Sequence, residues 1–366
     1  MSSQPPLSLQ RYSPALDEPT PEEAEIGRKI DETMGKVREK TYEDSGHAIR
    51  SVHAKSHGIL QAELEIDGDL PDVLAQGIFA HPGRHDVLMR FSTIPGDILP
   101  DSVSTPRGVA IKIFDVDGDR LPDSEGSRNQ DFILVNGPTF QAPDGKAFLG
   151  SLKPIAATTD RVEGLKKVVS AAARGIETVV EAVGGESAML KSMGGQPETH
   201  ILGDSFFSQL PMRFGDYIAK ISVAPLSDNL RALTDQPLDV NGVPDGIRAA
   251  VVDFFGSQTA VWEIRAQLCT NLDDMPLEPA NKEWSEDESP YVRLGTLTAK
   301  PQQAWSEERS RLVDDGMGFN PWNGVEAHRP LGSLMRMRKA AYKHSQQFRS
   351  ERNGTPVQEP DTLDLP

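Results

Sequence analysis

The 366-residue sequence predicts an α+β protein whose centre is an antiparallel β-barrel with attached helices. Three observations support this prediction. Most apolar runs are short and alternate with polar residues, as half-buried strands do. Strands and helices do not alternate in the manner of β-α-β units. The chain has no G-x-G-x-x-G motif, which disfavours a doubly wound nucleotide-binding fold, so an antiparallel barrel is the natural architecture.

Residues 1–44 are predicted to form an extended arm followed by one helix. The arm, residues 1–19, is rich in Pro and Ser, and T-P-E-E at 20–23 has the pattern of a capping box with Pro at the first helical position. Apolar residues then recur at helical spacing to about Lys40. They are Ile26, Ile30, Met34 and Val37.

Residues 45–300 are predicted to form the barrel, with a helical insertion at about 145–200. Strands are expected where the apolar alternation is clearest. These runs are 59–66, 86–93, 108–114, 131–136, 211–224, 258–269 and 291–299. Helices are expected at 71–80 and at about 245–255. In the insertion, helix-like spacing over 160–183 is interrupted by Gly164 and Gly175.

The C-terminal part of the chain is predicted to be helical and basic. Residues 301–350 are expected to contain a connection and then a helix over 332–349. This helix is basic, in contrast to the acidic chain before it. Residues 351–366 are expected to be a flexible tail.

Charge and composition exclude several classes of protein. The net charge of −17 is spread along the chain, which argues against nucleic-acid binding because that requires basic patches. No apolar run approaches the ~18 residues of a membrane span, and the N-terminus lacks the features of a secretory signal. The single cysteine, Cys269, rules out a disulfide framework within the chain. We therefore expect a cytoplasmic protein.

The stretch from Arg50 to Leu60 is the first candidate for chemistry. His53 immediately precedes the alternating run 59–66, so the sheet could hold its ring rigidly over a cavity. A lone histidine in such a position is more often structural than functional. Other motifs are therefore needed to decide between the two interpretations.

Six short motifs follow one another along residues 45–350. They are R-x-V-H-A-K at 50–55, R-F-S-T at 90–93, P-R-G-x-A-x-K at 106–112, L-V-N-G-P-x-F at 134–140, F-x-P-x-N at 319–323 and R-x-x-x-Y-x-x-x-x-x-x-R at 338–349. Each is weak alone, but the ordered set resembles the heme catalase family, in its short peroxidase-related branch without a C-terminal flavodoxin-like domain. The resemblance implies a catalase-type barrel, a heme b cofactor and a proximal heme helix near the C-terminus.

On the proximal side, the resemblance implies that the Tyr342 phenolate is the ligand of the heme iron. Arg338 lies one helical turn earlier on the same face, so its guanidinium can reach the phenol oxygen. Arg349, Arg50 and Arg90 would form ion pairs with the heme propionates. Without the other motifs, this segment would be typical of a basic surface helix with a half-buried tyrosine.

On the distal side, the resemblance implies that His53 is the acid and base that moves the peroxide proton. Asn136 would hold the peroxide by a hydrogen bond, and Ser92 would orient the His53 ring. Val52 would narrow the channel to the iron. Three aromatic residues would line the pocket: Phe140, Phe148 and Phe319.

The leading functional hypothesis is a heme-dependent oxidoreductase that decomposes or uses hydrogen peroxide by peroxidase or catalase chemistry. A second hypothesis is processing of organic or fatty-acid hydroperoxides, for which related proteins often have Thr where this chain has Val52. A third is a heme-binding protein with little turnover, which would not need His53 and Asn136. The electron donor is not identifiable from the sequence. The N-terminal arm is of the kind that wraps a partner subunit, which allows a homo-oligomer.

Overall fold

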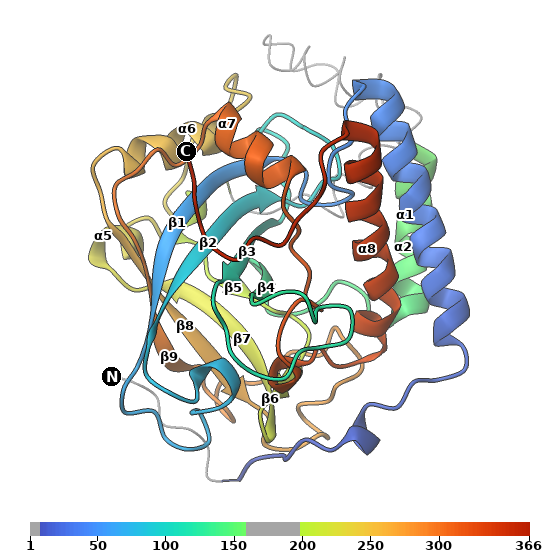
Figure 1. The fold of residues 1–366 in the computed structure, drawn as a ribbon, viewed down its shortest axis with the longest axis vertical. Helices are drawn as coiled ribbons and strands as arrows, with labels where there is room; N and C mark the ends of the chain where they lie inside the picture. The colour runs from blue at the N-terminus through green and yellow to red at the C-terminus, as the bar shows by residue number, and fades with distance from the viewer. Residues whose placement is uncertain (1–7, 159–197) are drawn as a thin grey trace.

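The centre of the protein is a closed antiparallel β-barrel, seen in a computed structural model that describes residues 8–158 and 198–366 (Figure 1). In this part of the chain the strands are β1 (Ser56–Ile66), β2 (Arg84–Thr93), β3 (Arg107–Ile113), β4 (Gln130–Val135), β5 (Phe206–Phe207), β6 (Met212–Phe214), β7 (Tyr217–Pro225), β8 (Ala260–Leu268) and β9 (Val292–Ala299). Neighbours follow the order β5-β4-β3-β2-β1-β9-β8-β7, and pairing of β5 with β7 closes the ring. The predicted α+β class and antiparallel barrel are confirmed.

The alternation that predicts strands corresponds to the two faces of the barrel wall. In β1, the side chains of Gln61, Glu63 and Glu65 are exposed while their neighbours are buried. The predicted strand at 211–224 is two strands, β6 and β7, because the chain turns at Gly215 with a φ of 61°. The predicted helix at 71–80 is wrong: that segment contains only the short 3₁₀ turn η2 (Gly77–Phe79).

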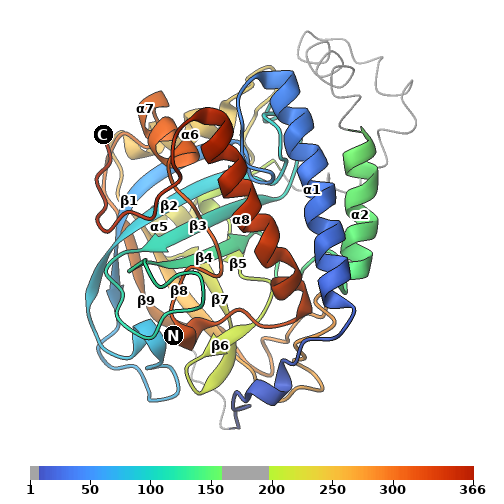
Figure 2. The ribbon, with the colours of Figure 1, turned by 45° about the vertical axis from the view of Figure 1, so that its right-hand side comes forward.

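Three long helices lie side by side against one flank of the barrel (Figure 2). They are α1 (Glu23–Ser45), α2 (Gly145–Thr158) and α8 (Ser333–Asn353). As the capping-box pattern predicts, Glu23 Oε1 accepts a hydrogen bond from the Thr20 N–H at 2.9 Å. The helix runs past the predicted end and stops at Gly46, where φ is 71°. The predicted helical stretch at 160–183 lies outside the described residues.

The remaining helical elements are shorter than these three helices. They are η1 (Pro14–Leu16), η5 (Ile201–Gly203), α5 (Asp228–Arg231), α6 (Gly246–Phe255), α7 (Glu307–Ser310), the π-helical turn η6 (Arg311–Asp315) and η7 (Glu326–His328). Helix α6 confirms the prediction at about 245–255. No helix in the described ranges combines the length and the apolar character needed to cross a bilayer.

The barrel interior is filled with apolar side chains and is therefore a packed core. Phe91 lies with its ring centroid 5.8 Å from that of Phe206 and 5.8 Å from that of Trp262, which are favourable aromatic separations. A second core lies between the three long helices and includes Ile30, Phe148 and Leu334. Because α8 is anchored by this second core, its inner face is held at a fixed distance from the barrel.

The C-terminal segment, expected to be a flexible tail, lies against the barrel. The Gln358 N–H donates to the Gly316 carbonyl at 2.8 Å, and Asn129 Nδ2 donates to the Pro360 carbonyl at 2.8 Å. Leu363 and Leu365 pack on an apolar cluster of β1, β2 and the segment after α7. Composition alone did not reveal this packing, because the partner groups lie far away in the sequence.

Candidate active site

His53 lies in the irregular segment between α1 and β1 and has a left-handed backbone, with a φ of 55°. Residues other than glycine rarely adopt this conformation unless neighbouring structure supports it. Here the His53 N–H donates to the Ile94 carbonyl at 2.8 Å, and the Ala54 N–H donates to the Pro95 carbonyl at 3.0 Å. The segment that follows β2 therefore fixes the backbone that carries the His53 ring.

The His53 ring is held between two barrel strands. Its Nδ1 lies 3.0 Å from Ser92 Oγ, as the predicted orienting role of Ser92 requires. A Cβ at Gly108 would lie 2.5 Å from Cε1 of the ring, so only glycine leaves room for the imidazole there. Burial, together with nearby arginine charges of which Arg90 is the strongest, lowers the pKa of His53 to about 3. The ring is therefore neutral at pH 7 and able to accept a proton.

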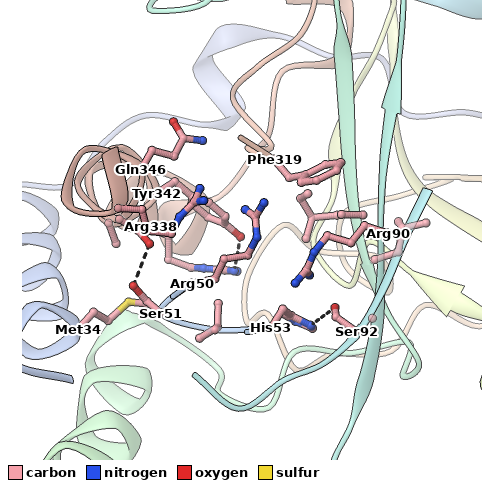
Figure 3. Close-up of a pocket in the computed structure, with 18 of the residues that line it drawn as sticks. Met34, Arg50, Ser51, His53, Arg90, Ser92, Phe319, Arg338, Tyr342 and Gln346 are labelled. Atoms are coloured by element: carbon pink, nitrogen blue, oxygen red, sulfur yellow. Dashed lines mark hydrogen bonds between the residues drawn. The ribbon is translucent and has the colours of Figure 1, made fainter. Parts of the chain in front are cut away.

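Tyr342 projects from α8 on the opposite side of the cavity (Figure 3). Arg338 Nη2 donates a hydrogen bond to Tyr342 Oη at 2.8 Å, as the spacing of one helical turn predicts. The same guanidinium lies 5.3 Å from the centroid of the Phe140 ring, within cation–π range. The phenol oxygen is thus held next to a permanent positive charge.

The three arginines that the family resemblance assigns to the heme propionates, Arg50, Arg90 and Arg349, do meet at one end of the site. They share one carboxylate: Asp314 Oδ1 accepts from Arg90 Nε at 2.5 Å and lies 3.8 Å from Arg50 Nε. Asp314 Oδ2 accepts from two hydroxyls, those of Ser56 and Ser310, each at 2.7 Å. Although burial alone would raise the pKa of Asp314, Arg90 and Arg50 bring it below its usual value, so the carboxylate is ionised.

The other arginine contacts go to backbone carbonyls. Arg50 Nη2 donates to the Val313 and Met317 carbonyls at 2.8 and 3.0 Å, and Arg349 Nη2 donates to the Met317 carbonyl at 3.3 Å. Burial lowers the pKa of Arg349 to about 10, and burial followed by repulsion from Arg349 lowers the pKa of Arg50. Asp314 and Asp315 offset only part of the free-energy cost of holding the three buried cations together.

The arginine cluster fits a ligand that carries two carboxylates. Three guanidinium groups are opposed by two nearby carboxylates, those of Asp314 and Asp315, which leaves a positive charge in excess. The buried Nε atoms of Arg50 and Arg349 have no hydrogen-bond partner among the described residues. Buried donors of this kind normally have a partner. The two propionates of heme b would supply both the charges and the acceptors, so these residues fit that cofactor.

Two cavities separate α8 from the barrel, with volumes of about 110 and 350 Å³. Together they fall in the range of about 300–1,000 Å³ that is usual for ligand pockets. Both are lined by Val52, His53, Ile133, Phe148, Arg338 and Tyr342, so they are two parts of one space. Of the two parts, the smaller one is also lined by the arginine cluster and Phe319, and the larger one by Phe140 and Asn136. All twelve residues that the sequence singles out line one part or the other.

Asn136 lies at the edge of the larger part, and its amide already has partners. Its Oδ1 accepts from the Arg107 N–H at 2.8 Å, and its Nδ2 donates to Asp204 Oδ2 at 3.3 Å. Phe140 and Phe148 pack against each other with ring centroids 5.2 Å apart. Phe319 lies at the other end, with the Arg50 guanidinium 5.4 Å from its ring centroid. A peroxide-holding role for Asn136 stays a prediction.

Asp314 is the residue of this site that sequence reasoning missed. It sits in an acidic pair in the π-helical turn η6, and nothing local distinguishes it from a solvated acid. The one available signal was indirect, since three clustered arginines in the interior require an internal counter-charge. Asp204, which contacts Asn136, was missed for the same reason.

Neither a protein-family model nor a curated protein sequence matches the chain. Solved catalases match its fold. Catalase A from Saccharomyces cerevisiae aligns with a TM-score of 0.58 and 15% identity over 99% of this chain and 73% of that one. A bacterial catalase aligns with a TM-score of 0.57 and 15% identity, over 97% of this chain and 66% of that one. A fungal catalase aligns with a TM-score of 0.54 and 17% identity, over 89% of this chain and 66% of that one.

The likeness to catalases extends along nearly the whole of this chain. The chain in turn spans about two thirds of the length of the fungal and bacterial catalases. At such low identity the match shows the fold, and the predicted catalase-type barrel is confirmed. The placement in a short branch of the family stays a prediction.

Proposed function

We propose that the protein binds heme b between α8 and the barrel, with Tyr342 as iron ligand, and acts on hydrogen peroxide. The observation that carries this proposal is that His53 and Tyr342 line the same space from opposite sides. The catalase fold of the whole chain agrees with it. The excess positive charge of the arginine cluster and its unpartnered Nε atoms support a cofactor that carries carboxylates.

When bound, the heme would supply the redox chemistry that no side chain of the site can provide. The chain's own contribution begins with Arg338, whose hydrogen bond orients the Tyr342 oxygen and would stabilise it as an iron ligand. Arg50, Arg90 and Arg349 would hold the propionates. Phe148 and Val52 would exclude water from the reacting face, because both line the space between His53 and Tyr342.

His53 would move the peroxide proton. In the tautomer in which Nδ1–H donates to Ser92 Oγ, the other ring nitrogen, Nε2, is unprotonated and can accept a proton from peroxide. The lowered pKa of His53 keeps the imidazole in this neutral form across the physiological range. The same nitrogen can then return the proton to the leaving oxygen, so that one residue serves as base and acid.

The test is to load the purified protein with hemin and follow hydrogen peroxide. Oxygen release without a donor indicates catalase chemistry, while oxidation of an added chromogenic donor indicates peroxidase chemistry. Rapid reaction with a bulky alkyl hydroperoxide but not with hydrogen peroxide would favour hydroperoxide processing. Tight heme binding with slow consumption of both oxidants would contradict an enzymatic role.

A further inference from the structure

We propose that Lys55 is a positioning residue for His53 and acts through the chain segment 94–101. The inference rests on the proposed role of His53 and extends it to a buried ion pair outside the pocket. Lys55 lines neither part of the cavity, so any influence on the chemistry must be transmitted through the backbone.

The Lys55 ammonium is buried and surrounded by oxygens from two other segments. The side chain is 2% exposed. Its Nζ donates to the Leu99 carbonyl at 2.9 Å, the Pro244 carbonyl at 2.6 Å and Asp101 Oδ1 at 2.7 Å. Asp245 Oδ1 lies at 3.0 Å. An ammonium has three protons to donate, so this environment satisfies it fully.

Asp101 extends the connection to the start of α6. Its Oδ2 accepts from the Ile247 N–H at 2.8 Å, and its own N–H donates to the Pro244 carbonyl at 3.0 Å. The carboxylate is itself 1% exposed, so the loss of the Lys55 charge would leave an uncompensated buried anion. Lys55 thus determines the position of the segment that contains Leu99 and Asp101.

The beginning of that same segment holds the His53 backbone. The Ile94 and Pro95 carbonyls accept the N–H groups of His53 and Ala54. At Gly96 the segment lies so close that a Cβ there would be 2.1 Å from the Ser51 carbonyl oxygen. A chain of contacts therefore runs from Lys55 to the left-handed His53 backbone, and from there to the ring beside Ser92.

A purely structural lysine would lower overall stability without changing His53 in particular. Lys220 on β7 provides the comparison, because it is also 2% exposed. Its Nζ lies 4.8 Å from the centroid of the Trp284 ring and 3.4 Å from the Lys282 carbonyl. It makes no contact with the segment 94–101 in the described part of the chain. Lys220→Met is therefore a matched control for Lys55→Met.

The experiment measures amide hydrogen exchange of His53 and Ala54 in the heme-free protein. In Lys55→Met we expect these amides to exchange about ten- to a hundredfold faster than in Lys220→Met, at denaturant concentrations that give both variants equal global stability. If Lys55→Met does not fold, Asp101→Asn is used, since its amide oxygen can still accept from Ile247. Equal exchange in the test and control variants would overturn the inference.

A second measurement separates this inference from the proposed function. After loading with hemin, Lys55→Met should bind heme with unchanged affinity but react with hydrogen peroxide at least about tenfold more slowly than Lys220→Met. Faster exchange at His53 with an unchanged reaction rate would contradict the acid–base role of His53. Slow exchange at His53 would contradict the positioning role of Lys55, whatever the rate.

Discussion

Arg90 Nε lies 2.5 Å from Asp314 Oδ1, and this contact makes Asp314 the internal counter-ion of the arginine cluster. The pair joins β2 to the π-helical turn η6, which precedes the segment that contains Phe319. The arginines are consequently held in place even when no cofactor carboxylate is bound. Such preorganisation lowers the entropic cost of binding, because the recognising groups do not have to be ordered by the ligand.

The first prediction concerns this counter-ion. Asp314→Asn keeps the shape of the side chain but removes the carboxylate that contacts Arg90 and Arg50, so we expect the heme-free protein to lose about 3–5 kcal/mol of unfolding free energy. Urea unfolding measures the loss. Asp67→Asn is the control. Asp67 forms an ion pair with Arg293, whose side chain is 41% exposed, and exposed ion pairs contribute about 0–1 kcal/mol to the free energy of unfolding. An equal loss in both variants would show that Asp314 has no special role.

The second prediction concerns the cofactor ligand. Tyr342→Phe removes the oxygen that would bind iron, so heme affinity should fall by at least about tenfold and the spectrum of the ferric protein should change. Titration with hemin, followed by absorbance, measures both. Tyr291→Phe is the control, because Tyr291 also has a guanidinium near its ring, with Arg265 5.1 Å from the ring centroid. The assignment fails if the two variants bind heme with the wild-type affinity and spectrum.

The third prediction concerns Arg338. Without its hydrogen bond, a proton competes more successfully with iron for the Tyr342 oxygen, and heme should be lost at a higher pH than in the wild type. We expect the midpoint of heme release in Arg338→Ala to rise by about one pH unit or more. An acid titration of the Soret band measures this midpoint. Arg265→Ala should titrate like the wild type, and an unshifted midpoint in Arg338→Ala would refute the prediction.

The fourth prediction concerns proton transfer. His53→Ala should bind heme normally, yet its reaction with hydrogen peroxide should slow by about 10²–10⁴-fold, the usual contribution of acid–base catalysis. Asn136→Ala should slow it less, because its amide is already bonded to Arg107 and Asp204. Stopped-flow absorbance measures both rates. His81→Ala, which changes an exposed histidine, serves as the control. If His53→Ala reacts with hydrogen peroxide as fast as this control does, His53 is not the proton shuttle.

The fifth prediction concerns acid stability and the buried His328. Burial lowers the pKa of His328 to about 3, well below the ~6.5 of an unfolded chain. The unfolded state therefore binds more protons between these values, and stability falls as the pH drops below about 6.5. His328→Gln can still accept from the Ile78 N–H and lacks this linkage. Between pH 7 and pH 5 the free energy of unfolding of His328→Gln should fall by about 2 kcal/mol less than that of the wild type, as measured by urea unfolding.

A control is needed because other buried groups also titrate in this range. His81→Gln changes an exposed histidine and should lose stability between pH 7 and pH 5 as the wild type does. If His328→Gln shows the same acid sensitivity as His81→Gln, the buried imidazole does not contribute to it.

The sequence predicted the barrel strands well because the alternation of period two is a local property. The sequence did not predict strand β5, because Phe206–Phe207 is too short to show any period. It predicted a helix at 71–80 that does not form, and Gly77 in this segment adopts a φ of 57°. In both cases long-range contacts decide the structure. The pairing of Val135 with Phe207 and of Phe206 with Val223 could not be inferred from either segment alone.

The candidate site was predicted from motifs, and the structure brings its residues around one space. The contacts within motifs, such as that of Arg338 with Tyr342, follow from helical spacing. Contacts between motifs do not. The position of Asp314 among the arginines and the packing of Leu363 on the barrel depend on residues from distant parts of the chain. Burial and charge compensation become visible only when these parts are assembled.

The pairing of β1 with β9 has a consequence for the order of folding. It joins Glu63 to Thr298, so a very long loop must close before the ring is complete, and topologies rich in such contacts fold slowly. His53 precedes the first strand and Tyr342 follows the last one. During synthesis on the ribosome, the two walls of the cavity therefore cannot meet until α8 has emerged, and capture of the proposed heme would have to follow that step.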